Sequence, residues 1–246
     1  MFIVPRRPWP LVGVPLIPWK LVAETDRPGG AKLALWRRDF EGRLSEFSLR
    51  ILEPNTPTNE LMNSRQHRSE KALAELAIKA LGRDAKSVLV GGLGMGFTLR
   101  AALDGLQPGA RVTVAELYPE VVTWNREHMG DLAGRPLDDQ RVSVHVGDVA
   151  ELLRVGKEQY DLILLDTDYG PEGTDPRDSK QLYSDAGLAN IRARLTPGGF
   201  LSVWSALESP SFIKRLERTG LDATVERPRA HGKSGTRRTV WLAKRR

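Results

Sequence analysis

The sequence predicts a doubly wound α/β fold with a mostly parallel, Rossmann-like sheet, preceded by a small N-terminal antiparallel β unit. From about residue 66 onward, apolar segments of strand type alternate with segments of helical periodicity. The segment 160–165, YDLILL, is almost continuously apolar. Such a run is typical of a strand at the centre of a parallel sheet that helices cover on both faces. Repeated strand–helix units of this length indicate a doubly wound sheet.

The region before residue 60 has a different, shorter pattern. Alternating runs at 19–23, 31–37 and 44–51 are separated by glycine-containing turns, which indicates antiparallel strands. Pro54 and Pro57 then mark a linker. The predicted division is therefore a proline-rich arm with a small β unit over residues 1–60, and a Rossmann-like cofactor-binding and catalytic domain over residues 61–246.

The alternation after residue 66 predicts the elements of the larger sheet in turn. Helical spacing of apolar residues predicts helices at 69–81, 97–103, 120–129, 149–155, 184–195 and 209–218. Short apolar runs predict strands at 87–90, 111–116, 142–146, 160–165, 200–204 and 239–243. A turn at 197–199, Pro-Gly-Gly, is expected before the strand at 200.

Composition excludes several classes of protein. The chain has no cysteine, so disulfides, thiolate zinc sites and a cysteine nucleophile are excluded. The four histidines show no metal-ligand spacing, and we expect no metal. Five prolines within residues 1–20 break any helix there, so we expect neither a signal segment nor a membrane span, and a cytoplasmic location.

The net charge of +6 leaves two interpretations open. Charge of this size serves solubility, and it also suits an anionic partner. The basic residues that would contact such a partner are Arg227, Arg229, Lys233, Arg237, Arg238, Lys244, Arg245 and Arg246. No aromatic residues of the RNA-binding kind are interleaved with them, so nucleic acid is not the expected partner. The apolar arm is compatible with a homodimer or with packing on its own core.

A glycine-rich loop follows the first predicted strand of the larger sheet. Gly92, Gly94 and Gly96 permit a tight turn and the close approach of a ligand to backbone. A dinucleotide fingerprint would place another glycine at Phe97. The spacing therefore favours an adenosyl ligand without pyrophosphate, and a plain tight turn is the alternative.

Two further strand ends carry acidic residues. Glu116 lies twenty residues past Gly96, where a carboxylate accepts hydrogen bonds from ribose hydroxyls. Asp148 either accepts a hydrogen bond from an adenine amino group or caps the following helix. Leu117 and Val149, which directly follow these acids, complete the predicted cofactor-binding residues.

The fourth strand ends in an acidic loop that begins at Asp166. Five acids and one base lie between Asp166 and Asp178 in a chain that is basic overall. This excess predicts a pocket for a cationic amine, in which a carboxylate removes a proton from the attacking nitrogen. A solvated loop that happens to be acidic is the alternative.

The strings VLVGGLGMG, VAELYPEVV, HVGDVAELL, YDLILLDTDYGP and LYSDAGLANIRARLTPGG together resemble the polyamine aminopropyltransferases, the spermidine synthase family. The resemblance covers 69–204 and implies a class I methyltransferase-like fold, decarboxylated S-adenosylmethionine as cofactor and a small-molecule amine as substrate. It implies Asp166 as the proton acceptor and Asp168 as a second amine ligand. The remaining predicted substrate-binding residues are Tyr169, Glu172, Tyr183 and Glu70.

The sequence departs from the family's pattern at three places. The family's glycine loop carries an aspartate that binds the amine of the cofactor, where this chain has Gly94. Ser69-Glu70 stand where the family tends to have tyrosine followed by histidine or glutamine, and the acidic loop is about two residues shorter. Two other functions therefore stay open: an S-adenosylmethionine-dependent methyltransferase acting on a small molecule, peptide or RNA, and a non-catalytic ligand-binding scaffold.

Overall fold

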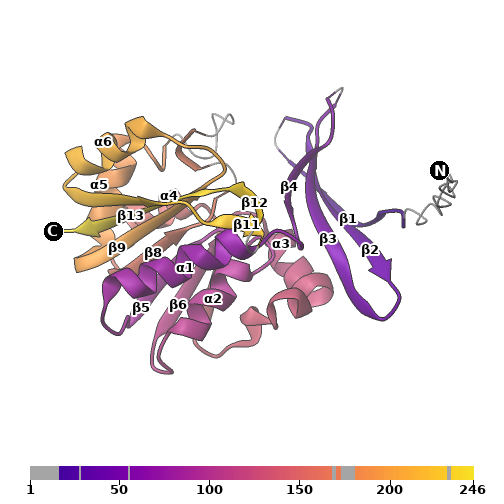
Figure 1. Cartoon of the computed structure of the whole chain (residues 1–246), viewed down its shortest axis with the longest axis horizontal. Helices are drawn as coiled ribbons and strands as arrows, with labels where there is room; N and C mark the ends of the chain where they lie inside the picture. Colours follow the sequence, from indigo (N-terminus) through magenta and orange to yellow (C-terminus); the bar gives the residue numbers. More distant parts are fainter. Residues whose placement is uncertain (1–16, 28, 55, 168–169, 173–180, 232–233) are drawn as a thin grey trace, which may run out of the picture.

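The computed structural model describes residues 17–246 except 28, 55, 168–169, 173–180 and 232–233. Figure 1 shows two parts, a larger α/β unit and a four-stranded sheet that stands beside one end of it. The sequence predicted this doubly wound α/β fold with an N-terminal antiparallel unit, and the prediction is confirmed. The junction between the two parts forms the candidate site.

The N-terminal sheet has the order β1-β2-β3-β4 and is antiparallel throughout. Its strands are β1 (Lys20–Asp26), β2 (Lys32–Phe40), β3 (Arg43–Leu52) and β4 (Asn59–Asn63). Alternation along β2 and β3 buries one set of apolar side chains against the larger unit: Leu33, Leu35, Phe47, Leu49 and Ile51. The sequence did not predict β4, because its first residues are polar and a proline precedes it; pairing with β3 provides the context that the local pattern lacks.

The larger sheet has the order β10-β13-β9-β8-β5-β6-β7. The parallel strands are β5 (Ser87–Gly91), β6 (Arg111–Glu116), β7 (Val142–Val146), β8 (Tyr160–Leu165) and β9 (Leu195–Ser205). The chain order reverses at β5, which lies between β6 and β8. Ligands of open α/β sheets bind beyond the carboxyl ends of the strands at such a reversal.

Helices cover both faces of this sheet. On one face lie α1 (Arg68–Leu81), α2 (Phe97–Gly105) and α3 (Pro119–Trp124), and on the other lie α4 (Val149–Val155), α5 (Asp185–Arg194) and α6 (Pro210–Arg218). Side chains of β8 alternate between the two cores: Leu162 and Leu164 pack toward α1 and α2, whereas Ile163 and Leu165 pack toward α4 and α5. Every residue of β8 is buried, as its apolar run predicts.

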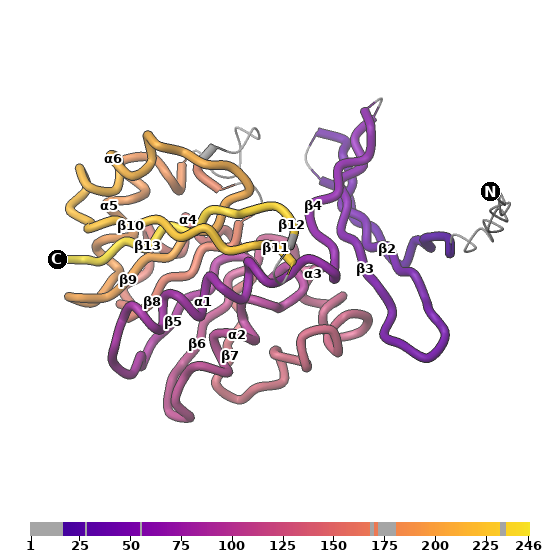
Figure 2. Tube along the Cα trace, viewed as in Figure 1, coloured from indigo at the N-terminus to yellow at the C-terminus, as the bar shows by residue number. Residues whose placement is uncertain are grey.

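The C-terminal part differs from the prediction in its details. Strand β9 begins at Leu195, so the expected turn at 197–199 lies within the strand as an irregularity in its pairing with β8. The sequence did not predict β10 (Leu221–Glu226), an edge strand whose residues alternate between exposed and partly buried positions. Strands β10 and β13 (Thr239–Arg245) are antiparallel to their neighbours. Between them, the hairpin β11 (Arg229–His231) and β12 (Ser234–Arg237) lies beside α1 (Figure 2).

Several basic residues near the C-terminus already have partners. Arg246 Nε donates to Asp222 Oδ1 at 2.8 Å, and Arg227 Nε donates to Glu208 Oε1 at 2.6 Å. Lys233 lies outside the described residues. Across the part of the chain that the structure describes, no helix combines the length and the apolar composition needed to cross a membrane.

A buried carboxylate joins the starts of three strands. Asp161 accepts hydrogen bonds from Lys86 N (2.8 Å), Thr196 Oγ1 (2.9 Å) and Arg83 Nη2 (2.7 Å). Burial alone would raise the pKa of Asp161, but these hydrogen bonds outweigh it and hold the pKa below its usual value.

We expect Asp161→Ala to lower the free energy of unfolding at pH 7 by about 1–3 kcal/mol, because it leaves buried donors unpaired. The folded-state pKa of Asp161 is depressed, so its stabilisation is complete above the unfolded pKa of about 3.9 and falls as the pH drops through the folded pKa. Urea unfolding at several pH values measures this. A difference between wild type and variant that stays constant down to pH 2 would contradict it.

Candidate active site

A pocket lies at the carboxyl edge of the parallel strands, between this edge and the N-terminal sheet. Its floor comes from the ends of β5, β6, β7 and β8, from the residues that follow them and from α1 and β9. Its roof comes from the N-terminal sheet and the β1–β2 turn. The floor residues are Glu70, Gly92, Gly94, Ala115, Glu116, Leu117, Tyr118, Val121, Gly147, Asp148, Val149, Asp166, Thr167, Leu182 and Trp204; the roof residues are Arg27, Leu33, Leu49, Leu61 and Met62.

The glycine loop approaches the end of β8 very closely. Gly92 has φ +92°, and a Cβ there would lie 2.3 Å from the backbone oxygen of Asp166. Gly96 has φ +82° and precedes the first residue of α2, where a Cβ would lie 2.9 Å from Pro136 Cγ. Only glycine fits such positions without displacing its neighbours.

Gly94 is held by a residue from a short π-helical turn. The helix predicted at 120–129 is α-helical only to Trp124, and Asn125–Met129 form the π turn. Asn125 Nδ2 lies within hydrogen-bonding distance of both Gly94 O (2.7 Å) and Val121 O (2.9 Å). The π turn therefore fixes the loop that Gly94 belongs to, a role often found for such turns near functional sites.

Glu116 is 7% exposed and lies in the pocket wall at the end of β6. Its Oε2 accepts a hydrogen bond from Leu93 N at 2.9 Å, and its Oε1 accepts one from Tyr118 N at 3.0 Å. These bonds orient the carboxylate, whose oxygens have further lone pairs with which to accept hydrogen bonds from a ligand. Leu117 lines the same wall and is 44% exposed.

Asp148 caps a helix, one of the two roles that the sequence left open, and the adenine contact stays a prediction. Its Oδ1 accepts a hydrogen bond from Ala150 N at 2.7 Å and caps α4. The residue also lines the pocket, together with the buried Val149. A helix cap with its carboxylate at the pocket wall is compatible with a second hydrogen bond to a ligand.

Asp166, the first residue after β8, lies in the pocket and is held from two sides. Its backbone N donates to Gly91 O at 2.8 Å. Its Oδ2 accepts a hydrogen bond from Thr98 Oγ1 at 2.5 Å. Thr98 is 2% exposed and lies in the first turn of α2, so the sequence pattern gave no reason to single it out. The hydroxyl helps to orient the carboxylate at the pocket wall.

Glu70 is the fourth described carboxyl group of the pocket, beside those of Glu116, Asp148 and Asp166, and is 6% exposed. Burial raises the pKa of Glu70, while the hydrogen bond from Ser69 Oγ to its Oε2 (2.6 Å) and the positive charge of Arg238 act in the opposite direction. Thr98 Oγ1 also lies 3.1 Å from the backbone oxygen of Glu70. Because the Thr98 hydroxyl has one proton for these two acceptors, the shorter contact, with Asp166 Oδ2, is the hydrogen bond.

The remaining predicted residues lie in different surroundings. Tyr183 is 1% exposed, and its phenol oxygen is 2.8 Å from Oγ1 of Thr167, which lines the pocket. Asp168 and Tyr169 lie outside the described residues, as does the side chain of Glu172.

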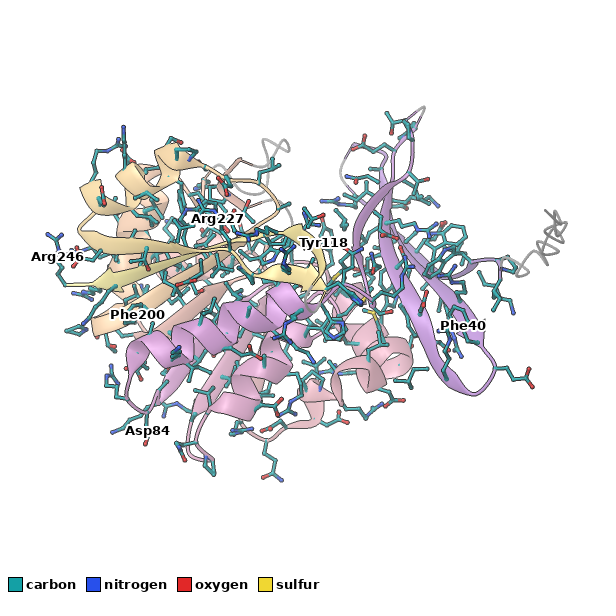
Figure 3. All side chains as sticks on the ribbon, in the orientation of Figure 1. Phe40, Asp84, Tyr118, Phe200, Arg227 and Arg246 are labelled. Carbon is teal, nitrogen blue, oxygen red and sulfur yellow. The ribbon has the colours of Figure 1, made fainter. Side chains whose placement is uncertain are left out.

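The roof was not predicted from the sequence. Arg27 follows β1, and its Nε donates to the phenol oxygen of Tyr118 at 2.8 Å, which joins the N-terminal sheet to the end of β6. Figure 3 shows Tyr118 between the two parts of the molecule. No signal in the sequence connects residues 27–62 to the strand ends, because the contact is purely tertiary. Among the described residues, no group of three or more histidine or acidic side chains is placed to hold a metal ion.

The comparisons with known proteins agree with this geometry. A polyamine aminopropyltransferase from Prochlorococcus marinus (strain MIT 9215) is 26% identical over 148 residues, which cover 59% of this chain and 49% of that protein. One from Korarchaeum cryptofilum (strain OPF8) is 26% identical over 132 residues, covering 53% and 38%. The chain thus spans about half or less of the length of these relatives. The crystal structure of spermidine synthase from Thermotoga maritima superposes with a TM-score of 0.67 at 18% identity, covering 92% of this chain and 73% of that one.

A spermidine synthase in complex with the transition state analogue AdoDATO gives a TM-score of 0.68 at 18% identity, over 92% of this chain and 74% of that one. The fold and the edge pocket thus define a Rossmann-like protein of the class I methyltransferase type. A family model described as the spermine/spermidine synthase domain matches residues 66–218, more than half of the chain. The chain belongs to the spermine/spermidine synthase family, and the predicted family resemblance is confirmed.

The close approach at Gly92 generates a stability prediction. We expect Gly92→Ala to lower the free energy of unfolding by at least about 1 kcal/mol more than Gly30→Ala. Both glycines have φ between +80° and +95°, so backbone strain is similar, but a Cβ at Gly30 meets nothing within 4 Å. Urea unfolding of the two variants measures the difference. Equal losses would show that the contact with Asp166 is not a constraint.

Proposed function

We propose that this protein is an alkyltransferase that moves an aminopropyl group from decarboxylated S-adenosylmethionine to a di- or polyamine. The observation that carries the proposal is the placement of Glu116 and Asp166 in one pocket at the point where the strand order reverses. Membership of the spermine/spermidine synthase family supports the same reaction.

The residues present fit a sulfonium nucleoside. Gly92 and Gly94 line the pocket with backbone atoms, and the places of their missing side chains are taken by the Asp166 carbonyl and the Met62 thioether. The oriented carboxylate of Glu116 suits the two hydroxyls of a ribose. Leu117 and Val149 offer apolar surface to an adenine ring. When bound, the sulfonium supplies the electrophilic carbon and the thioether leaving group.

Asp166 would act as the proton acceptor. An alkylammonium has a pKa of about 10, so at neutral pH only about one molecule in a thousand is a free base. Asp166 would hold the ammonium in place and accept its proton as the nitrogen forms the new bond to carbon. The carbon–sulfur bond breaks in the same step, and its electron pair passes to sulfur. Most of the acceleration would come from alignment, which supplies up to about 7–11 kcal/mol.

One observation favours a second candidate, transfer of a methyl group from S-adenosylmethionine. The chain has Gly94 where an acidic residue would bind the amine of a decarboxylated donor, and Met62 lies against that position. Position 94 therefore carries no negative charge that would favour the decarboxylated donor over S-adenosylmethionine.

Product analysis separates the two reactions. The full-length protein is incubated with each form of the donor and a panel of amines. Methylthioadenosine together with an amine enlarged by an aminopropyl group supports the first reaction. S-adenosylhomocysteine supports the second. If a donor binds but neither product forms, the proposal of an enzyme is overturned and the protein is a ligand-binding scaffold.

We expect Asp166→Asn to lower kcat by about 10²–10⁴-fold, because an amide cannot accept the ammonium proton. Donor affinity, measured by calorimetry, should stay within about threefold of wild type, since Glu116 and the glycine loop are unchanged. A variant that turns over at the wild-type rate would remove Asp166 from the proton-accepting role.

Thr98 allows a matched test of how Asp166 is positioned. We expect Thr98→Val, which replaces the hydroxyl by a methyl group of similar size, to lower kcat by about ten- to a hundredfold with little change in the KM for the donor. Thr98→Ser retains the hydroxyl that donates to Asp166 Oδ2 and should recover most of kcat. Equal losses in both variants would indicate a packing role instead.

A further inference from the structure

The thioether of Met62 lies directly against the glycine loop. A Cβ built on Gly94 would lie 2.9 Å from Met62 Sδ and 3.2 Å from its Cε. Both residues line the pocket, Gly94 from the floor and Met62 from the roof. Met62 belongs to β4, where it pairs with Leu49, so the four-stranded sheet places this thioether. The space next to Gly94 is therefore occupied by an apolar group from a distant part of the chain.

The roof side of this contact carries no carboxylate: its residues are apolar except for Arg27, whose Nε donates to Tyr118. Leu33, Leu49 and Leu61 line the pocket beside Met62. The carboxylates of the described wall lie on the floor at the strand ends and on α1, and position 94 has no side chain with which to add another. Unbranched methionine side chains fill irregular space and accept varied apolar partners.

We propose that Met62 and Gly94 make this pocket recognise its sulfonium donor through the nucleoside and not through a charge on the donor's tail. The tail lies against the Met62 thioether, and no carboxylate at position 94 meets an ammonium there. A sulfonium donor with a charged amine on its tail therefore gains little affinity over the nucleoside alone. This inference rests on the proposed function, because it assumes an adenosine-based donor in this pocket.

Binding of two ligands to the wild-type protein provides the first test. Titration calorimetry without acceptor compares the dimethylsulfonium derivative of methylthioadenosine, which has the sulfonium charge but no amine, with decarboxylated S-adenosylmethionine. We expect dissociation constants within about threefold of each other, since a charge-assisted hydrogen bond would separate them by about tenfold or more. A preference of tenfold or more for the amine-bearing ligand would overturn the inference even if the protein is an active transferase.

Two matched variants provide the second test. Met62→Ala/Gly94→Asp empties the space and adds a carboxylate, and aspartate tolerates the φ of +50° at this position better than most residues. Met62→Ala/Gly94→Asn has the same shape without the charge. We expect the aspartate variant to prefer decarboxylated S-adenosylmethionine over the dimethylsulfonium nucleoside by about tenfold, and the asparagine variant to bind both equally.

The outcomes distinguish this inference from the proposed function. If neither ligand binds the wild-type protein, the proposed function fails and the inference fails with it. If both bind but the aspartate and asparagine variants behave alike, the donor's tail does not lie beside position 94, and the inference is wrong while the proposed function stands. The wild-type comparison remains decisive even if a variant does not fold.

Discussion

The site depends on a backbone contact between the glycine loop and the end of β8. A Cβ on Gly92 would lie only 2.3 Å from the carbonyl oxygen of Asp166, and Asp166 N donates to Gly91 O at 2.8 Å. Gly92 N in turn donates to Ala115 O at 2.8 Å, next to Glu116. The ends of β5, β6 and β8 are therefore joined through main-chain atoms. Because of this connection, one carboxylate on each side of the loop enters the same pocket.

Much of the fold could be predicted from local pattern, and the exceptions have physical causes. The five parallel strands were predicted from short runs rich in apolar residues: every residue of β8 is buried and only Asp161 is charged, whereas β7 alternates valine with polar residues. Strand β4 was missed because its pairing with β3, and not its composition, makes it a strand. Strand β10 was missed because an edge strand alternates polar and apolar residues over a short length. The π turn at Asn125–Met129 retains helical spacing and cannot be distinguished from a helix by periodicity.

The floor of the site was also predictable, because strand ends of a parallel sheet meet at one edge. The sequence placed Gly92, Glu116, Asp148 and Asp166 there, and all four line the pocket. Thr98 was not identified because a threonine in the first turn of a helix has many uses, and only the tertiary structure shows that it contacts Asp166. The roof depends on how two sheets pack, which no local pattern encodes. The binding roles of the individual residues remain predictions.

The division of the pocket between two sheets has a consequence for how its specificity can change. The family model matches residues 66–218, whereas the roof residues lie between Arg27 and Met62. Substitutions in the roof leave the main-chain contacts between β5, β6 and β8 intact. The surface that a ligand would meet from the roof can therefore change through substitutions in the first quarter of the chain, while the strand ends that form the floor keep their arrangement.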